Sequence, residues 1–291
     1  MLVHEGKVCL YNFLLAVVVI FAIAIPEFRF KYSLDNWLVI FWSPLLLYGI
    51  LNFVIYLYYS ASSDYQVAIR ACFLGYIFSM GLFIFFLAPE HIRAFGLYAV
   101  IMGTFHWTEY MGIALSNPKT LSPDSFVLNH STHYVVAAAS SWVEFFLESY
   151  FFPQIKTLRL FWVIGFLLCF SGDLLRKVAM ITAHSNFTHI VQFVRVEEHK
   201  LVTNGVYGCM RHPSYVGWFW WSIGTQIVLV NPVCTILYSI VAWLFFRDRV
   251  YVEEITLLNF FGEEYVEYQK KVGTGLPFIH GYHQGMPIVP D

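Results

Sequence analysis

The chain has 291 residues, of which 58% are hydrophobic, 20% are aromatic and only 12% are charged. Soluble domains carry about 25% charged residues. This composition therefore excludes a single soluble domain that hides its apolar side chains in one core. The net charge of −2 gives no indication of a nucleic-acid partner, because nucleic-acid binding depends on an excess of positive charge. We predict a polytopic membrane protein.

Eight apolar segments are long enough to cross a membrane as helices. About 20 apolar residues span a hydrocarbon core of ~30 Å. This ruler places the spans near residues 8–26, 36–59, 67–88, 93–115, 132–152, 158–181, 213–230 and 233–250. Only Asn231 and Pro232 separate the last two spans, which predicts a tight antiparallel helical hairpin. The first span has no small-residue cleavage pattern after it, so we expect it to be retained.

The five cysteines are scattered along the chain and form no Cys-x-x-Cys pair. This pattern argues against a disulfide framework and against a thiolate metal site, and we predict no metal.

Basic residues are divided unevenly between the two sides of the membrane. Eight spans put both termini on one side, and positive charge is enriched on the cytoplasmic side of short loops. We therefore predict that both termini face the cytosol. Twelve of the 17 basic residues fall on that side: Lys7, Arg70, Lys119, Arg176, Lys177, Arg195, Lys200, Arg211, Arg247, Arg249, Lys270 and Lys271.

The longest polar segment, residues 182–212, lies between the sixth and seventh spans. Pro213 follows it and suits the first position of the next helix, because its missing N–H needs no partner there. The N–H groups of Ser214 and Tyr215 then lie at a helix N-terminus, where the helix dipole favours an anion. By itself, His212 is explained equally well as a residue that flanks a helix.

A charged cluster ends the hairpin on the same membrane face. Arg249 and Glu253 are four residues apart on one helical face, with Arg247 and Glu254 on a neighbouring stripe. A salt-bridged helix end exposed to solvent is the simpler explanation of such a cluster. Because the two ends of a hairpin meet, however, the cluster returns to the level of His212. Polar groups that converge beside an apolar cavity are typical of a small-molecule site.

Several stretches of this region form a recognisable set. They are residues 172–189, residues 211–226, Asn231-Pro232, Glu253-Glu254, Phe261-Gly262-Glu263-Glu264-Tyr265 and Tyr268. Together they resemble the isoprenylcysteine carboxyl methyltransferases, with a close match over residues 130–280. The His-Pro-x-Tyr and Glu-Glu elements are also found in phospholipid methyltransferases, and the longer run from Arg211 to Gln226 separates the two families.

The resemblance implies methyl transfer from S-adenosylmethionine to the C-terminal carboxylate of a prenylated cysteine. The expected partners are prenylated CaaX proteins such as small GTPases, and the expected location is the endoplasmic reticulum membrane, with the active site facing the cytosol. Arg249 would hold the substrate carboxylate. The expected cofactor contacts are Gln192, His199, Lys200, Leu201, Val202, Tyr207, His212, Pro213, Ser214, Tyr215 and Glu253.

These roles agree with the chemistry. An α-carboxylate has a pKa of about 3.5 and is ionised at neutral pH, so the reaction requires no general base. Transfer brings an anion to a sulfonium, and the protein has mainly to position the two groups. The resemblance implies that Arg249 and Glu253 are the catalytic residues. Glu253 would either anchor polar groups of the cofactor or orient Arg249, and the sequence does not separate these roles.

The prenyl chain is expected to enter sideways from the lipid bilayer, which already solvates it. Its candidate walls, which ordinary packing explains equally well, are Trp142, Phe146, Trp218 and Trp221. Four acids lie within or near the spans, in a helix-packing network or at a substrate portal: Glu109, Glu144, Glu148 and Asp173.

The predicted architecture is an all-α polytopic integral membrane protein with about eight transmembrane helices, a C-terminal helical hairpin and a cytosolic cofactor pocket. Residues 1–130 would hold helices 1 to 4. Residues 131–291 would form the catalytic membrane region, with helices 5 to 8, the cytosolic loop 182–212 and the C-terminal segment.

Four other classes of function remain as alternatives. A phospholipid N-methyltransferase and an NADPH-dependent membrane reductase are the first two, although no Gly-x-Gly-x-x-Gly follows a strand here. A scaffold or channel would thread polar residues through the spans, whereas here they gather at one end. A membrane metal hydroxylase would use His184, His189, His199 and His212, but their spacing repeats no i, i+4 pair.

Overall fold

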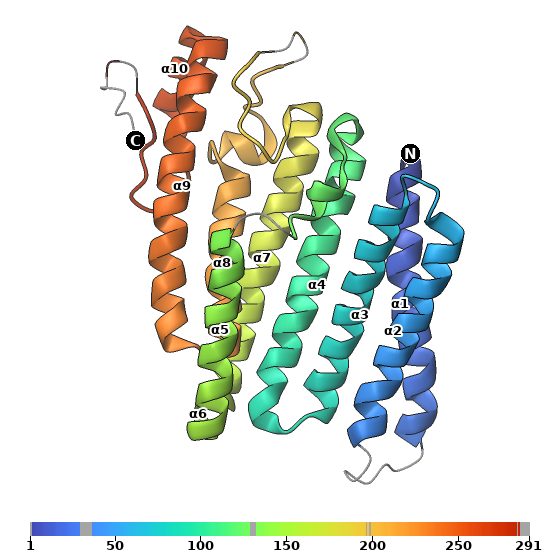
Figure 1. The fold of residues 1–291 in the computed structure, drawn as a ribbon. Helices are drawn as coiled ribbons and strands as arrows, with labels where there is room; N and C mark the ends of the chain where they lie inside the picture. Colours follow the sequence, from blue (N-terminus) through green and yellow to red (C-terminus); the bar gives the residue numbers. More distant parts are fainter. Residues whose placement is uncertain are drawn as a thin grey trace. The chain divides into compact units, whose positions relative to one another are not determined.

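The computed structural model describes residues 2–29, 37–128, 132–195, 197, 199–283 and 285, and only the backbone of residues 23–29, 37–41 and 133. Every regular element in this part of the chain is helical, as predicted (Figure 1). The α-helices are α1 (His4–Arg29), α2 (Trp37–Tyr59), α3 (Tyr65–Leu87), α4 (Glu90–Ser116), α5 (Thr132–Phe151), α6 (Pro153–Lys156), α7 (Arg159–Ala183), α8 (Pro213–Leu229), α9 (Pro232–Phe261) and α10 (Glu263–Lys271).

Each of the eight predicted spans falls on one long helix, from α1 to α5 and from α7 to α9. Within the described residues, three stretches are long and apolar enough to cross a membrane by length and composition: His4–Ala22, Trp42–Tyr59 and Tyr65–Leu87. The count of eight transmembrane helices therefore stays a prediction.

The chain divides into two compact units by its internal contacts. Unit 1 comprises residues 1–115, 121–162 and 228–230, and unit 2 comprises residues 116–120, 163–227 and 231–291. Helix α5 belongs to unit 1, so the contacts do not follow the predicted functional division after residue 130. That functional division stays a prediction.

Unit 1 is an apolar helical assembly. Gly75 of α3 lies directly against α1, since a Cβ atom at this position would come within 2.5 Å of the Phe13 carbonyl oxygen. The Phe13 ring stacks on Trp107 of α4 at 4.4 Å, and Tyr110 stacks on Phe126 at 4.2 Å. Close packing of small and aromatic residues thus holds these helices together.

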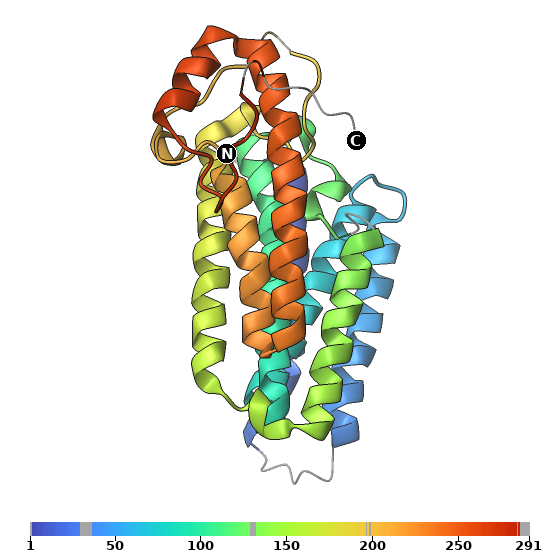
Figure 2. The same ribbon diagram turned by 90° about the vertical axis from the view of Figure 1, so that its left-hand side faces the viewer.

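Unit 2 contains most of α7 and α8, together with α9 and α10. Gly172 of α7 and Gly217 of α8 approach so closely that a Cβ atom on Gly217 would lie 2.4 Å from the Gly172 carbonyl oxygen. Asn231 closes the hairpin by donating its side-chain amide to Gln226 at 3.2 Å. The predicted hairpin is confirmed, and α8 and α9 run side by side in both views (Figures 1 and 2). As predicted, Pro213 is the first residue of α8.

Candidate active site

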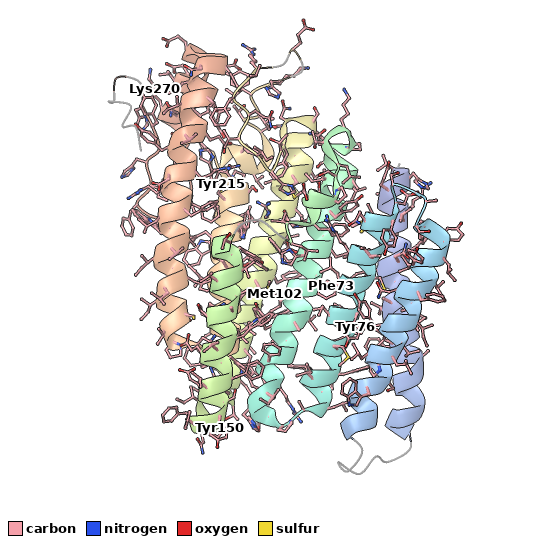
Figure 3. All side chains as sticks on the ribbon, viewed as in Figure 1. Phe73, Tyr76, Met102, Tyr150, Tyr215 and Lys270 are labelled. Carbon is pink, nitrogen blue, oxygen red and sulfur yellow. The ribbon has the colours of Figure 1, made fainter. Side chains whose placement is uncertain are left out.

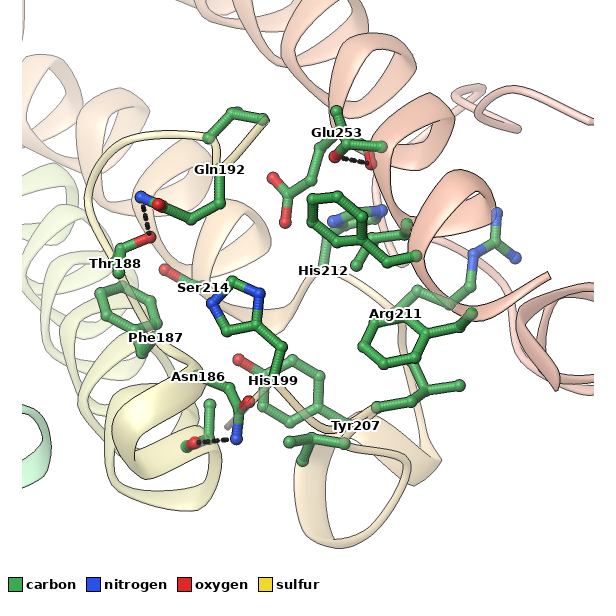
Figure 4. A pocket seen from close by; sticks show the side chains of 18 of the residues that line it. Asn186, Phe187, Thr188, Gln192, His199, Tyr207, Arg211, His212, Ser214 and Glu253 are labelled. Atoms are coloured by element: carbon green, nitrogen blue, oxygen red, sulfur yellow. Dashed lines mark hydrogen bonds between the residues drawn. The ribbon is translucent and has the colours of Figure 1, made fainter. Parts of the chain in front are cut away.

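Unit 2 contains a pocket of ≈ 150 Å³, bounded by the loop after α7, the start of α8, the C-terminal end of α9 and one side of α10 (Figure 4). One buried water molecule requires about 10–15 Å³ on this measure. The pocket is therefore large enough for a small organic molecule. Apolar side chains line one part of it, including Phe187, Leu257 and Phe260, and polar side chains line the rest.

The residues expected to contact a cofactor are brought together in this pocket. All eleven line it, although they come from the loop, from α8 and from α9: Gln192, His199, Lys200, Leu201, Val202, Tyr207, His212, Pro213, Ser214, Tyr215 and Glu253. Their role as cofactor contacts stays a prediction.

Tyr215 connects the two residues expected to be catalytic. It projects from the first turn of α8 (Figure 3), and its hydroxyl donates a hydrogen bond to the Glu253 carboxylate. Nε of Arg249 donates to the same hydroxyl oxygen at 3.1 Å, and Nη2 of Arg249 donates to the His189 carbonyl at 2.8 Å. Glu253 thus lines the pocket and also reaches Arg249 through Tyr215, so the geometry is compatible with both roles considered for Glu253.

Glu254 belongs to a second, buried cluster, although its partners Arg211, His212 and Tyr265 also line the pocket. Its side chain is 0% exposed and accepts hydrogen bonds from Arg211 Nε at 2.8 Å and from His212 Nε2 at 3.1 Å. The Tyr265 hydroxyl and the Gln269 amide also donate to it, each at 3.1 Å. Burial opposes ionisation of Glu254, but His212 and Arg211 outweigh it and hold the pKa of this carboxyl below its usual value.

The interpretation of the charged cluster as a solvated helix end is therefore wrong for Glu254, because α9 continues to Phe261 and α10 and the tail cover it. Sequence reasoning did not assign roles to Arg211, Tyr265 or Gln269. Arg211 and Tyr265 stand in the matched motif, which was the available signal.

The chain after α10 closes the outer side of the Glu254 cluster. The backbone N–H groups of Arg211 and His212 donate to the carbonyls of Gly273 at 2.8 Å and Thr274 at 3.2 Å. Nη2 of Arg211 donates to the His280 carbonyl at 2.9 Å. These bonds fasten the tail to the segment that leads into α8.

The loop after α7 forms one wall of the pocket, called here the pocket roof, and hydrogen bonds within the loop hold it in place. The backbone N–H of Lys200 donates to Asn186 Oδ1 at 2.8 Å, and Gln192 Nε2 donates to the Ile190 carbonyl at 3.1 Å. Figure 4 shows His199 projecting into the pocket above Tyr207. The His199 ring also lies 5.9 Å from that of Phe260.

Two tyrosines, the buried Tyr268 and the partly buried Tyr207, form part of the wall. The Tyr268 hydroxyl donates to the Tyr207 carbonyl at 2.5 Å. Burial raises the pKa of Tyr268 to about 12, and burial also raises the pKa of Tyr207, with the Glu253 charge adding to the effect. Both hydroxyls therefore stay protonated at neutral pH.

Arg176 of α7 is a buried cation that the sequence predictions did not include among the site residues. Nη1 of Arg176 donates to Ser214 Oγ at 2.6 Å, and its guanidinium lies 4.6 Å from the centre of the Trp218 ring. It therefore joins a pocket-lining residue to one of the predicted prenyl-binding aromatics. An ionisable residue inside a predicted span was the available signal.

The other aromatics expected to bind the prenyl chain are engaged in packing. Trp221 is buried, and its Cβ atom lies against Gly172 of α7. In unit 1, Trp142 donates its indole N–H to the Tyr98 hydroxyl at 3.3 Å, and the Phe146 ring lies 5.0 Å from Phe95. A role in prenyl binding stays a prediction for all four aromatics.

Two of the acids near the spans take part in ion pairs. Glu148 pairs with the fully buried Lys156 at 2.6 Å, and Lys156 also donates to the carbonyls of Leu229 and Val230, which favours a helix-packing role. Asp173 pairs with Lys177, one turn along α7, at 2.8 Å.

Comparison with known proteins identifies similar sequences. The model of the isoprenylcysteine carboxyl methyltransferase (ICMT) family matches residues 163–259. A protein-S-isoprenylcysteine O-methyltransferase of Tribolium castaneum is 47% identical over 97% of this chain and 99% of its own length. The Homo sapiens protein of the same name is 54% identical over 75% of this chain and 76% of its own length.

The fold is also similar to that of a solved structure, which is described as the eukaryotic intramembrane Ras methyltransferase ICMT. The two structures superpose with a TM-score of 0.91, and their sequences are 45% identical. The match covers 97% of this chain and 100% of the solved chain.

Proposed function

The chain belongs to the isoprenylcysteine carboxyl methyltransferase family, and from that premise we propose that S-adenosylmethionine is its methyl donor. We propose further that the methyl group goes to the C-terminal α-carboxylate of a prenylated cysteine in CaaX-processed proteins. Family membership makes the chain a membrane protein and a methyltransferase of prenylcysteine. The observation that carries the finer proposal is the convergence of all eleven expected cofactor residues on one pocket, with Arg249 attached to it through Tyr215.

The side chains of the pocket fit S-adenosylmethionine. The Glu253 carboxylate suits a cationic group, Gln192 and Ser214 offer polar partners for hydroxyl groups, and Phe187 and Phe260 offer apolar surface for the adenine ring. When bound, the cofactor supplies an electrophilic methyl group on a sulfonium. The protein's own contribution is to bind and orient, because the substrate carboxylate is already ionised at neutral pH.

Arg249 is the proposed partner of the substrate carboxylate. A guanidinium presents N–H groups that match a carboxylate in geometry and charge. Tyr215 and the His189 carbonyl hold the Arg249 side chain by Nε and Nη2. Correct placement of two reactants contributes several kcal/mol to lowering a reaction barrier. Arg176, between Ser214 and Trp218, is the second cation that we place near the reacting groups.

The proposed substrates are prenylated proteins such as small GTPases. The similar solved protein is described as a Ras methyltransferase, which supports this class. We propose that the chain crosses the endoplasmic reticulum membrane with eight helices, that its pocket opens to the cytosol, and that the prenyl chain enters from the bilayer.

The test is a methylation assay on the detergent-purified protein with labelled S-adenosylmethionine. N-acetyl-S-farnesyl-cysteine and phosphatidylethanolamine are offered in parallel reactions. Base-labile label on the farnesyl-cysteine is the expected result, because methyl esters hydrolyse in base. Label on the lipid alone would contradict the proposal in favour of a phospholipid methyltransferase, and label on neither would also contradict it.

A further inference from the structure

The tail after α10 presents one large aromatic side chain to its surroundings. Phe278 is 89% exposed, more than any other large apolar side chain in the described part of the chain. Its φ of +60° lies in the left-handed region, which is unfavourable for a bulky residue. Leu276 and Ile279 on either side are buried, at 5% exposed each. The turn from Leu276 to Ile279 therefore points the Phe278 ring outward, although both the positive φ and the exposure of an apolar ring to water are unfavourable.

This turn is fixed at a defined level of α9. The indole N–H of Trp243 donates to the Pro277 carbonyl at 2.8 Å. Thr274, just before the turn, donates from Oγ1 to the Ile279 carbonyl at 2.5 Å. Figure 1 shows the tail turning back beside α9 after α10. Phe278 thus lies next to the Trp243 level of this helix.

Trp243 lies near the end of the exposed apolar surface of α9. Seven exposed apolar side chains form this surface: Val233, Ile236, Leu237, Ile240, Val241, Leu244 and Phe245. Arg247 follows one turn after Trp243, and its guanidinium lies 5.6 Å from the centre of the Trp243 ring. Tryptophan and arginine at the end of an apolar helix surface are typical of the boundary between hydrocarbon and headgroups.

A second exposed phenylalanine lies at a different level. Phe193 in the pocket roof is 69% exposed. The neighbouring Arg195 donates to the Phe260 carbonyl at 2.5 Å, and Phe260 is 17 positions beyond Trp243 on α9. At a rise of 1.5 Å per residue, the two levels differ by about 25 Å along the helix. Phe193 therefore lies beyond the apolar surface of α9, in the cytosol according to the predicted orientation.

We propose that the Leu276–Ile279 turn docks on the cytosolic leaflet of the bilayer and inserts the Phe278 ring among the acyl chains just below the headgroups. The exposed apolar surface of α9 continues directly into this turn, and Arg247 supplies a cation at the headgroup level. The proposal depends on α9 being a transmembrane helix and does not depend on methyl transfer.

Lipid contact at this turn would also stabilise the pocket. Arg211 is bonded to the tail on both sides of Phe278, at Gly273 and at His280. The same arginine is the partner of Glu254. The bilayer would thus hold in place the segment that closes the buried cluster beside His212.

The test measures the depth of position 278 in the full-length protein in nanodiscs. Cys209, which is exposed, is replaced by serine, since the other four cysteines are buried. Phe278→Cys then carries an environment-sensitive fluorophore, and Phe193→Cys is the matched control. Nitroxide attached near the top of the lipid acyl chain should quench the label at 278 several-fold more than the label at 193. Iodide in the water should show the reverse order.

Equal quenching of both labels by iodide, with no quenching by lipid nitroxide at 278, would overturn the proposal. A second measurement guards against disturbance by the label. A photoreactive benzoylphenylalanine at position 278 should crosslink to phospholipid, whereas the same group at position 193 should not. Crosslinking of neither position would contradict lipid contact, while failure of the methylation assay would leave this proposal intact.

Discussion

Glu253 and Glu254 are neighbours in α9, yet their carboxylates belong to clusters of different kinds. Glu253 lines the pocket and accepts a hydrogen bond from Tyr215, which in turn accepts one from Arg249. Glu254 faces away from solvent and accepts from Arg211, His212, Tyr265 and Gln269. The Glu253 carboxylate borders the open space of the pocket, whereas the Glu254 carboxylate is enclosed by protein, even though its partners Arg211, His212 and Tyr265 also line the pocket.

The difference shows how the end of α9 contributes to both binding and stability, with Glu253 at the pocket and Glu254 in the protein interior. A buried carboxylate is tolerated only when charge and hydrogen bonds compensate its loss of water. The Glu254 cluster meets this condition by joining the segment before α8, α9, α10 and the tail. The stacked rings of His212 and Tyr215, 5.5 Å apart and 4° from parallel, connect the two clusters. We therefore expect substitution of Glu254 to affect folding, and substitution of Glu253, Tyr215 or Arg249 to affect binding and rate.

The largest expected effect is that of Glu254→Ala. Removing this carboxylate leaves Arg211 buried without its counter-charge, and breaking one partner of a buried pair costs about 3–5 kcal/mol. The free energy of unfolding, measured by denaturant titration in detergent, should fall by this amount. Glu267→Ala on the exposed face of α10 is the control and should leave stability unchanged. A Glu254→Ala protein as stable as the parent would refute the structural role.

Arg249→Ala should mainly reduce turnover. Loss of the group that positions the substrate carboxylate should lower kcat by about 10²–10³-fold, as for other charge-stabilising donors. Affinity for S-adenosylhomocysteine, measured by calorimetry, should change little. Arg247→Ala is the matched control, since this neighbouring arginine is half-exposed and pairs with Asp248. Normal turnover by Arg249→Ala would exclude the proposed role.

Tyr215→Phe should have a smaller effect on rate. It keeps the ring that stacks on His212 but removes the hydroxyl between Glu253 and Arg249. Hydrogen bonds to charged groups contribute about 1.5–3 kcal/mol, so kcat/KM should fall by roughly 10- to 100-fold. Tyr207→Phe, which keeps another pocket ring, provides the comparison. An unchanged kcat/KM would mean that Tyr215 does not orient Arg249.

The pH dependence of stability should show the smallest effect. The pKa of Glu254 is lower in the folded protein than its usual value, so its contribution is complete above the unfolded pKa of about 4.3. It is lost as the pH falls from there through the folded pKa. Between pH 6 and pH 3 the parent protein should therefore lose more stability than Glu254→Gln does. Parallel curves for the two proteins would contradict the lowered pKa.

Much of the fold could be predicted from the sequence because the physical signals are local. Apolar segments of sufficient length located eight of the helices, and Asn231-Pro232 located the hairpin. The start of α8 at Pro213 followed from the tolerance of proline at a first helical position. The eleven expected cofactor contacts, by contrast, were predicted from the family resemblance of a long motif, because hydrophobic periodicity gives no information about them.

The buried cluster could not be predicted because its members are brought together by tertiary packing. Glu254 is adjacent to a pocket residue, but its partners lie 43 positions earlier and up to 15 positions later. Charged residues at a helix end usually face solvent, and here α10 and the tail cover one of them. Arg176 was missed for a similar reason, since its partner Ser214 lies 38 positions away.

The most direct test is thermal unfolding of Glu253→Gln and Glu254→Gln with increasing S-adenosylhomocysteine. A ligand that binds the folded state raises the midpoint temperature, so one titration reports stability and binding together. Glu254→Gln should unfold at a lower temperature without ligand and still respond to it. Glu253→Gln should unfold near the parent temperature and lose most of the response. The same behaviour in both variants, or the reverse assignment, would contradict the division of α9 into a binding face and a structural face.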